Sequence, residues 1–138
     1  MERLTREQAV RVLRTRGIAP TRQRVEIASE LLGRPQHLCA DQLLAQVNQE
    51  ESLVSKATVY NTLGLFARKG LVREVLVDPT KVFYDSNMQP HHHYYNESTG
   101  RLFDVPDDGL RLEAQPASPD GMAVVGVDVV VRVRDIDR

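Results

Sequence analysis

The apolar residues in the first half of the chain recur three and four positions apart, which is the spacing of amphipathic helices. This pattern predicts four helices, over Thr5–Arg16, Thr21–Leu32, Ala40–Val47 and from Ser55 to just before Gly70. Threonine and serine, at the start of the first and last stretch, cap helices by accepting a hydrogen bond from a free backbone N–H. A glycine follows each of these two stretches and favours termination there.

Residues 71–85 have the pattern of a β-hairpin. Two runs rich in β-branched and aromatic residues, Leu71–Val77 and Lys81–Asp85, flank the turn residues Asp78-Pro79-Thr80. Several short helices followed by such a hairpin are typical of a winged helix-turn-helix, in which the hairpin forms the wing. We therefore predict a winged-helix DNA-binding domain over residues 1–85.

The pattern of residues 86–138 is different. His91–Asn96 and Arg101–Val105 are short candidate strands, and residues 106–121 hold three prolines and two glycines, which favour a loop. Val124–Val133 contains seven valines, and positions 127, 129, 131 and 133 are all valine, as in a half-buried strand. Three short strands enclose too little interior to be stable alone, so we expect a second copy of the chain to cover them in a homodimer.

Together these patterns predict an α+β chain, with an N-terminal winged helix-turn-helix followed by a small α/β dimerisation domain over residues 86–138. The composition, 41% hydrophobic and 27% charged over 138 residues, is that of a globular protein. No apolar run approaches the roughly 20 residues of a membrane span. The N-terminus lacks the apolar core of a signal peptide, so we expect a cytoplasmic protein without a membrane partner.

Formal charge is distributed unevenly along the chain. Residues 1–85 carry a net charge of +3 and residues 86–138 a net charge of −4, and the first 24 residues alone carry +5. A basic N-terminal part favours an anionic partner, and double-stranded DNA is the candidate.

The helix that begins at Ser55 is the candidate for insertion into a major groove, because its polar side carries hydrogen-bond donors and positive charge. The start of the second helix is a candidate phosphate clamp, since free N–H groups lie there beside two arginines. The predicted DNA contacts are Thr21, Arg22, Arg24, Ser55, Lys56, Thr58, Tyr60, Asn61 and, near the tip of the wing, Lys81. The alternative is a set of ordinary solvated surfaces on an amphipathic bundle.

Three of the four histidines are consecutive, at positions 91–93. On a strand His91 and His93 share one face, and carboxylates and the fourth histidine, His37, flank the block in the sequence. Imidazole nitrogens and carboxylate oxygens without sulfur are compatible with Fe²⁺, Mn²⁺ and Zn²⁺. The alternative is a solvated polar patch near a domain junction. The single cysteine, Cys39, excludes an intrachain disulfide and is more typical of a small residue at a helix start than of a ligand or redox switch.

These residues, taken in order, resemble the ferric uptake regulator (Fur) superfamily. The resemblance is carried by Pro20-Thr21-Arg22-Gln23-Arg24, by His37 with Ala40-Asp41-Gln42-Leu43, by Ala57-Thr58-Val59-Tyr60-Asn61, and by Asp85 with the histidine block. It implies a dimeric winged-helix repressor that senses metal at the hinge between its two domains and binds a near-palindromic operator. The hinge ligands it implies are His37, Asp85, His91, His93 and Asp104.

One departure narrows the resemblance. Most of the superfamily has two Cys-x-x-Cys pairs that hold a structural zinc, whereas this chain has Asn96 and Thr99 at the first pair and no second pair. A four-cysteine zinc site is therefore excluded. The Tyr94-Tyr95 pair after the histidines and the Val127–Arg132 ending are similar to the cysteine-poor iron response regulator (Irr) branch. That branch implies control of iron and haem genes, with haem as a possible signal.

A haem site would use the block His91, His92 and His93, because the Cys-Pro motif that binds haem in some members is missing and Cys39 is followed by Ala40. A peroxide-responsive regulator, or one that responds to manganese or zinc, is the alternative within the superfamily. A small metallo-enzyme with an ion on His91, His93 and Asp85 is a distant alternative, since no general base, nucleophile or glycine-rich phosphate loop accompanies them. A metal or haem carrier without a DNA role is disfavoured by the arginine-rich first helices.

Overall fold

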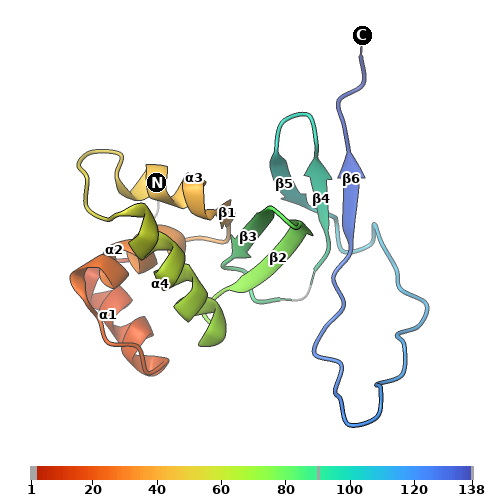
Figure 1. The fold of residues 1–138 in the computed structure, drawn as a ribbon, viewed down its shortest axis with the longest axis horizontal. Coiled ribbons are helices and arrows are strands. Elements are labelled where there is room, and N and C mark those ends of the chain that lie inside the picture. The colour runs from red at the N-terminus through yellow and green to blue at the C-terminus, as the bar shows by residue number, and fades with distance from the viewer. Residues whose placement is uncertain (1–2, 90, 138) are drawn as a thin grey trace. The chain divides into compact units, whose positions relative to one another are not determined.

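The computed structural model describes residues 3–89 and 91–137, and the chain forms two compact units, Met1–Met88 and Gln89–Arg138 (Figure 1). The elements of the first unit are α1 (Arg6–Thr15), α2 (Arg22–Leu31), β1 (His37–Cys39), α3 (Ala40–Val47), α4 (Lys56–Arg68), β2 (Arg73–Asp78) and β3 (Lys81–Asp85). The four predicted helices and both strands of the hairpin are present, with ends that shift by two residues or fewer.

Side-chain caps fix where the helices begin. Thr5 Oγ1 accepts a hydrogen bond from the backbone N–H of Gln8 while the Gln8 side chain accepts one from Thr5 N–H, so two free donors of α1 are satisfied reciprocally. Thr21 and Ser55 cap α2 and α4 with a single such bond each, in which the side-chain oxygen accepts the backbone N–H of Arg24 or of Thr58. Gly70 lies just beyond α4 at a φ of 76°, a left-handed conformation that glycine adopts without a steric cost.

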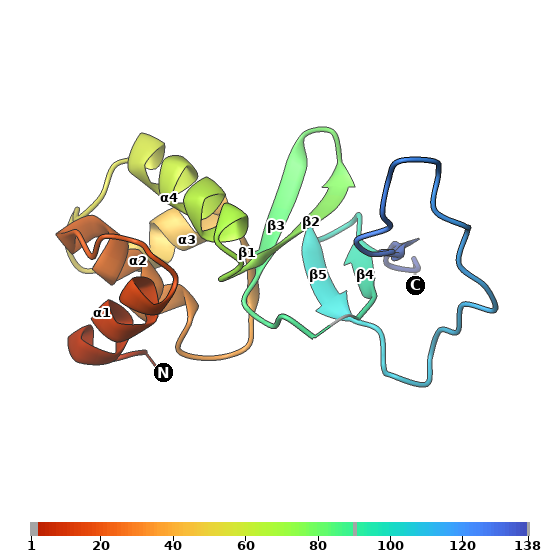
Figure 2. The same ribbon diagram turned by 90° about the horizontal axis from the view of Figure 1, so that it is seen from below.

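The helices of the first unit pack around a shared core, and Figure 2 shows them gathered together with the β2–β3 hairpin leading away from α4. Its largest fully buried aliphatic and aromatic side chains include Leu13, Ile27, Leu31, Leu63 and Phe66, one or two from each of three helices. Burial of these stripes fixes the polar face of α4 toward solvent, because the same helix cannot bury both faces.

The hairpin belongs to a three-stranded antiparallel sheet of order β1-β3-β2. Strand β1 was not predicted, because three residues are too few for an apolar period to show. It places His37 opposite Asp85 in the β1–β3 ladder. The helices followed by this hairpin confirm the predicted winged helix-turn-helix.

The second unit is a three-stranded sheet of order β5-β4-β6, made of β4 (His93–Asn96), β5 (Arg101–Asp104) and β6 (Val130–Val133). Strands β4 and β5 are antiparallel and β4 and β6 are parallel. The predicted last strand was too long: residues 124–129 are irregular, and Val124 and Val125 are exposed.

The α+β class is confirmed, although the helical part expected in the second domain is absent from residues 91–137. The prolines and glycines of residues 106–121 explain this, since neither residue type sustains a helix interior. Among the described residues, no helix is long and apolar enough to span a lipid bilayer.

Candidate metal centre and nucleic-acid interface

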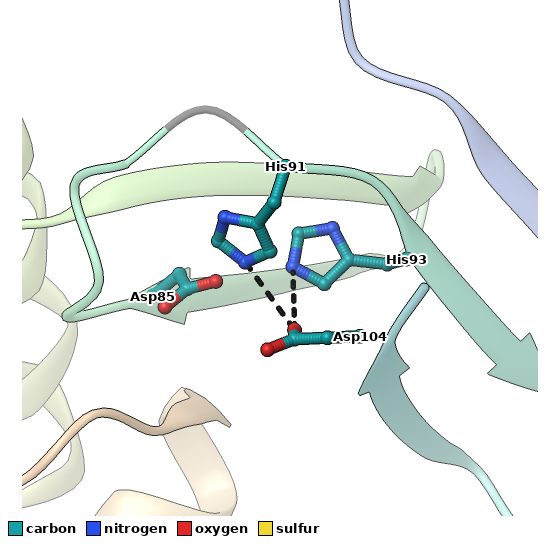
Figure 3. A group of neighbouring side chains, drawn as sticks. All are labelled: Asp85, His91, His93 and Asp104. Carbon is teal, nitrogen blue, oxygen red and sulfur yellow. Dashed lines mark ion pairs between the residues drawn. The ribbon is translucent and has the colours of Figure 1, made fainter. Parts of the chain in front are cut away.

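Two histidines and a carboxylate converge within the second unit. His93 begins β4 and faces Asp104, its register partner at the end of β5, so both side chains project from the same face of the sheet. Asp104 Oδ1 lies 3.5 Å from Nε2 of His93 and 3.3 Å from Nε2 of His91 (Figure 3). The two imidazole rings are 4.4 Å apart, centre to centre. Three donor atoms thus surround one small volume.

The protonation of His91 follows from its other neighbour. A carbonyl oxygen only accepts hydrogen bonds, so the contact of His91 Nδ1 with the Gln89 carbonyl requires an N–H at Nδ1. In the neutral ring this leaves a lone pair on Nε2, the atom that faces Asp104. A lone pair and a carboxylate oxygen at this separation repel each other unless a cation or a proton lies between them. The arrangement therefore suits a bound cation.

The donor set and its surroundings fit a divalent transition metal. His93 is 1% exposed and the His91 side chain 9% exposed, so water competes poorly for the site, while Asp104 is open to solvent on one side. The Gln89 carbonyl orients the His91 ring, as outer-shell acceptors do for metal-bound histidines. Nitrogen and oxygen donors together favour Fe²⁺, Mn²⁺ or Zn²⁺ over Ca²⁺ or Mg²⁺.

The other two predicted ligands lie in the first unit, where the sheet pairs them. His37 on β1 and Asp85 on β3 are register partners, and Asp85 is 1% exposed. One carboxylate oxygen of Asp85 accepts the backbone N–H of Asn87 at 2.8 Å, which fixes its orientation. The five predicted ligands are thus brought together as two groups, one inside each unit. Figure 3 draws the side chains of Asp85, His91, His93 and Asp104.

His92 takes a different direction from its neighbours, as strand alternation predicts. Its Nδ1 accepts the backbone N–H of Val129 at 3.1 Å, which ties it to the segment that leads into β6. A haem site on the whole block His91, His92 and His93 stays a prediction. Sequence reasoning missed the Gln89 carbonyl, because a backbone group carries no sequence signal.

Helix α4, the helix predicted to insert into a major groove, presents a polar face on the first unit. Ser55 Oγ accepts the N–H of Thr58 at 3.1 Å and donates to Thr58 Oγ1, so both hydroxyls serve the cap of α4. Lys56, Tyr60 and Asn61 are exposed, and Tyr60 keeps 46% of its surface in solvent. Lys56 Nζ lies 5.9 Å from the centre of the Tyr60 ring and 3.6 Å from Asp41.

The wing closes a small groove beside this helix. A cavity of about 290 Å³ is lined by Tyr60 of α4, by Lys81 and Tyr84 of β3 and by the start of α3 at Cys39 and Asp41, among others. Two of the predicted DNA contacts, Tyr60 and Lys81, therefore line the same groove although they are 21 positions apart in the sequence. Tyr84 was missed by sequence reasoning, because alternation along β3 gives no hint that this residue lines a groove.

Two titratable groups of the wing are perturbed. Burial raises the pKa of Tyr84 above its ordinary value, and the neighbouring Glu74 and Tyr60 add to the effect. At the wing tip Asp78 accepts hydrogen bonds from the Thr80 hydroxyl and backbone N–H, and these hold the pKa of its carboxyl below the ordinary value. Both pKa shifts arise from contacts that require the hairpin to be folded.

The start of α2 carries the remaining predicted contacts. Thr21 caps the helix through the backbone N–H of Arg24 at 3.4 Å, and the Arg24 guanidinium donates to the Ala19 carbonyl at 3.0 Å. Arg22 is exposed. Thr21 and Arg24 therefore build the helix start, and Arg22 is the more accessible of the two arginines.

Residues 15–132 match the ferric uptake regulator family. This chain belongs to that family. The peroxide-responsive repressor PerR of Staphylococcus aureus (strain Mu50 / ATCC 700699) is 31% identical to it over 98 residues, which make up 71% of this chain and 66% of that protein. The chain thus spans just under two thirds of the length of the curated relatives it matches.

Solved structures of the ferric uptake regulator family share this fold. The regulator of Vibrio cholerae has a TM-score of 0.70 at 20% identity, covering 91% of this chain and 98% of that one. The regulator of Pseudomonas aeruginosa with manganese has a TM-score of 0.65 at 22% identity, covering 92% and 97%. The names of these relatives describe regulators and a repressor, not enzymes, so the metallo-enzyme alternative receives no support.

Proposed function

We propose that this chain is a dimeric DNA-binding transcription regulator whose affinity for duplex DNA depends on a divalent metal ion. The proposed ligands are His91, His93 and Asp104 of the second unit with His37 and Asp85 of the first. The observation that carries the proposal is the convergence of both Nε2 atoms on one carboxylate oxygen of Asp104, in a chain of the ferric uptake regulator family.

The proposed mechanism couples the two units through their ligands. Asp85 and His91 are six residues apart, so the chain keeps their backbones within about 20 Å of each other in any conformation. When bound, the metal supplies positive charge that draws nitrogen and oxygen donors to fixed separations. The ligands of both units then hold one geometry, which selects the spacing of the two α4 helices in a dimer.

Contacts to duplex DNA are proposed for two kinds of residue. Lys56, Tyr60 and Asn61 are exposed on α4 and present donors to base edges, and Arg22 and Lys81 present charge to phosphates. The remaining proposed contacts, Thr21, Arg24, Ser55 and Thr58, hold the starts of α2 and α4 in place.

A second copy of the chain is the proposed partner of the second unit. The sheet leaves β6 at its edge, and the preceding Val124 and Val125 are exposed. An edge strand and exposed valines in the same unit favour association with a like surface.

The regulated genes and the signal are a finer proposal. The missing cysteine pairs and the Tyr94-Tyr95 pair are similar to the iron response regulator branch, which favours control of iron and haem genes by repression. Peroxide sensing by bound iron is the second candidate, and it is favoured by the similarity to the S. aureus repressor PerR. No contact in the described residues favours haem over a metal ion, so we propose the metal as ligand.

Fluorescence anisotropy tests this proposal with the full chain and a labelled, AT-rich palindromic duplex. We expect affinity to change at least about tenfold, the usual scale of such coupling, between Mn²⁺ and excess chelator. A random duplex of equal length is the control for specificity. Equal affinity for both duplexes, with and without metal, would contradict the proposed function.

A further inference from the structure

Strand β4 lies between β5 and β6 in the sheet of the second unit (Figure 1). His92, the residue before β4, is hydrogen-bonded to the segments beside both neighbouring strands. Its carbonyl oxygen accepts the backbone N–H of Val105, the residue that follows β5, at 2.9 Å. Its ring nitrogen Nδ1 accepts the backbone N–H of Val129, the residue before β6, at 3.1 Å. His92 therefore links the end of one outer strand to the start of the other.

Both backbone groups of Val129 are held by the histidine block. While its N–H donates to the His92 ring, its carbonyl oxygen accepts the backbone N–H of His93 at 3.1 Å. The chain before it is irregular from residue 106 onward, where backbone hydrogen bonds such as that from Gly109 to Pro106 close local turns. Val129 is thus the point at which a long loop rejoins the sheet, and residues 92 and 93 set where β6 begins.

Metal ligation acts directly on this short segment. The proposed ligands His91 and His93 are the two chain neighbours of His92, and residues 91 and 92 belong to no helix or strand. An ion bound to both flanking rings fixes the residues on either side of His92. It therefore also restricts the backbone of His92 and the direction of its ring, because metal binding orders the segment that supplies the ligands.

We propose that His92 is a positioning residue that carries metal occupancy from His91 and His93 to β6. With metal bound, its ring stays directed at the Val129 N–H and the start of β6 stays attached to β4. Without metal, this hydrogen bond opens more often. The inference rests on the proposed metal site, and it extends the effect of the metal to the edge strand of the second unit.

The other end of β6 supplies an internal reference. The backbone N–H of Asp135, just beyond β6, donates to Ser98 Oγ at 3.0 Å, and the Asp135 carboxylate accepts from the Asn96 side chain at 2.9 Å. Asn96 is the last residue of β4, so these contacts lie at the opposite end of that strand from the histidines. A metal effect that passes through His92 therefore reaches the Val129 amide but not the Asp135 amide.

Amide hydrogen exchange, measured by NMR on the full chain with Zn²⁺ and with excess chelator, tests this proposal. We expect Zn²⁺ to slow exchange of the Val129 amide by at least about tenfold, within the usual range of coupling between two sites, and to leave Asp135 unchanged. In H92N the side-chain oxygen takes the place of Nδ1 and should preserve the effect. In H92Q the oxygen lies one bond further along the side chain, and the effect should be lost.

Two controls accompany these variants. Isothermal titration records Zn²⁺ binding separately, and protection of the Asp135 amide shows that the sheet is formed in each variant. Because the wild type alone can fail the test, the proposal is still tested if H92Q does not fold.

Other outcomes overturn the proposal. Zn²⁺ binding that leaves Val129 exchange unchanged, or that slows Val129 and Asp135 equally, refutes the role of His92 and leaves the metal site standing. An equal response in H92N and H92Q also refutes it, because the position of the acceptor atom then has no effect. A wild type that binds no Zn²⁺ would refute the proposed metal centre as well.

Discussion

His93 and Asp104 face each other across β4 and β5, with Nε2 and Oδ1 3.5 Å apart at a site where His93 is 1% exposed. An antiparallel register partner is the closest neighbour that a strand residue has on its own face. The sheet itself, and not a flexible loop, therefore sets the separation of the imidazole and the carboxylate. This rigidity is what a metal site needs to select among cations.

Removing the shared carboxylate should abolish tight metal binding. In D104N the amide oxygen keeps the shape of the side chain, but the negative charge that attracts the cation is lost. We expect metal affinity to fall by about 10–100-fold, as for other disturbed metal sites, measured by isothermal titration with Mn²⁺. D108N, a nearby exposed aspartate, is the control and should bind as the wild type does. Equal affinity of D104N would remove Asp104 from the site.

Asp85 tests whether the first unit shares the metal. Its carboxylate is buried and already oriented by the Asn87 N–H, so D85N preserves volume while removing charge. We expect metal affinity to fall by about tenfold or more, with the circular dichroism spectrum unchanged. D78N, at the wing tip, is the matched control. Unchanged affinity in D85N would restrict the metal to the second unit.

Arg22 and Tyr60 should affect DNA binding in different ways. An exposed arginine that contacts a phosphate releases counterions, so R22A should lower the dependence of log affinity on log salt by about one unit for every sequence. Tyr60 lies on the exposed polar face of α4 that is proposed to contact base edges. Y60A should therefore lower affinity for the operator more than for random duplex. Anisotropy titrations from 50 to 200 mM salt, roughly the range in which such slopes are measured, distinguish them. If each variant lost the same affinity for the operator as for random duplex, Tyr60 would be assigned to the phosphate backbone of the DNA and not to base edges.

Asn48 should be important for stability rather than for function. Its side chain accepts the backbone N–H groups of Leu53 and Val54 and donates to the Val54 carbonyl, and so holds the loop between α3 and α4. We expect N48A to lower the free energy of unfolding by about 1–3 kcal/mol, because three backbone groups lose their partner. Urea unfolding measures this, with Q49A at an exposed neighbouring site as the control. A stability equal to that of wild type would show that water replaces the side chain.

Tyr84 should make the first unit sensitive to alkali. Its pKa is raised in the folded state, first by burial and then by Glu74 and Tyr60, so the folded chain keeps the phenol proton at a pH where the unfolded chain loses it. The contribution to stability is complete below about pH 10, the ordinary tyrosine value, and is lost as pH rises through the folded pKa. Urea midpoints should therefore fall less above that pH in Y84F than in wild type. An equal fall would assign alkaline unfolding to other groups.

Much of the local structure could be predicted from the sequence, because it depends on neighbours in the chain. The helix starts at Thr5 and Ser55 follow from hydroxyl caps, and α3 has the predicted ends. The hairpin follows from a turn between two β-rich runs. The predicted strand over Val124–Val133 failed in its first six residues, since alternation shows which face is apolar but not whether a neighbouring strand is there to pair with it.

The sequence by itself determined the ligand types, the absence of a four-cysteine zinc site and the polar face of α4, since each of these depends on residue identity and helical period alone. Tertiary structure decided which donors meet. The strand pairs β1–β3 and β4–β5 place His37 opposite Asp85 and His93 opposite Asp104, and the fold of the chain before β4 aims the His91 ring at the same oxygen. Such distances depend on the register between segments remote in sequence, and the pattern within one segment carries no record of that register.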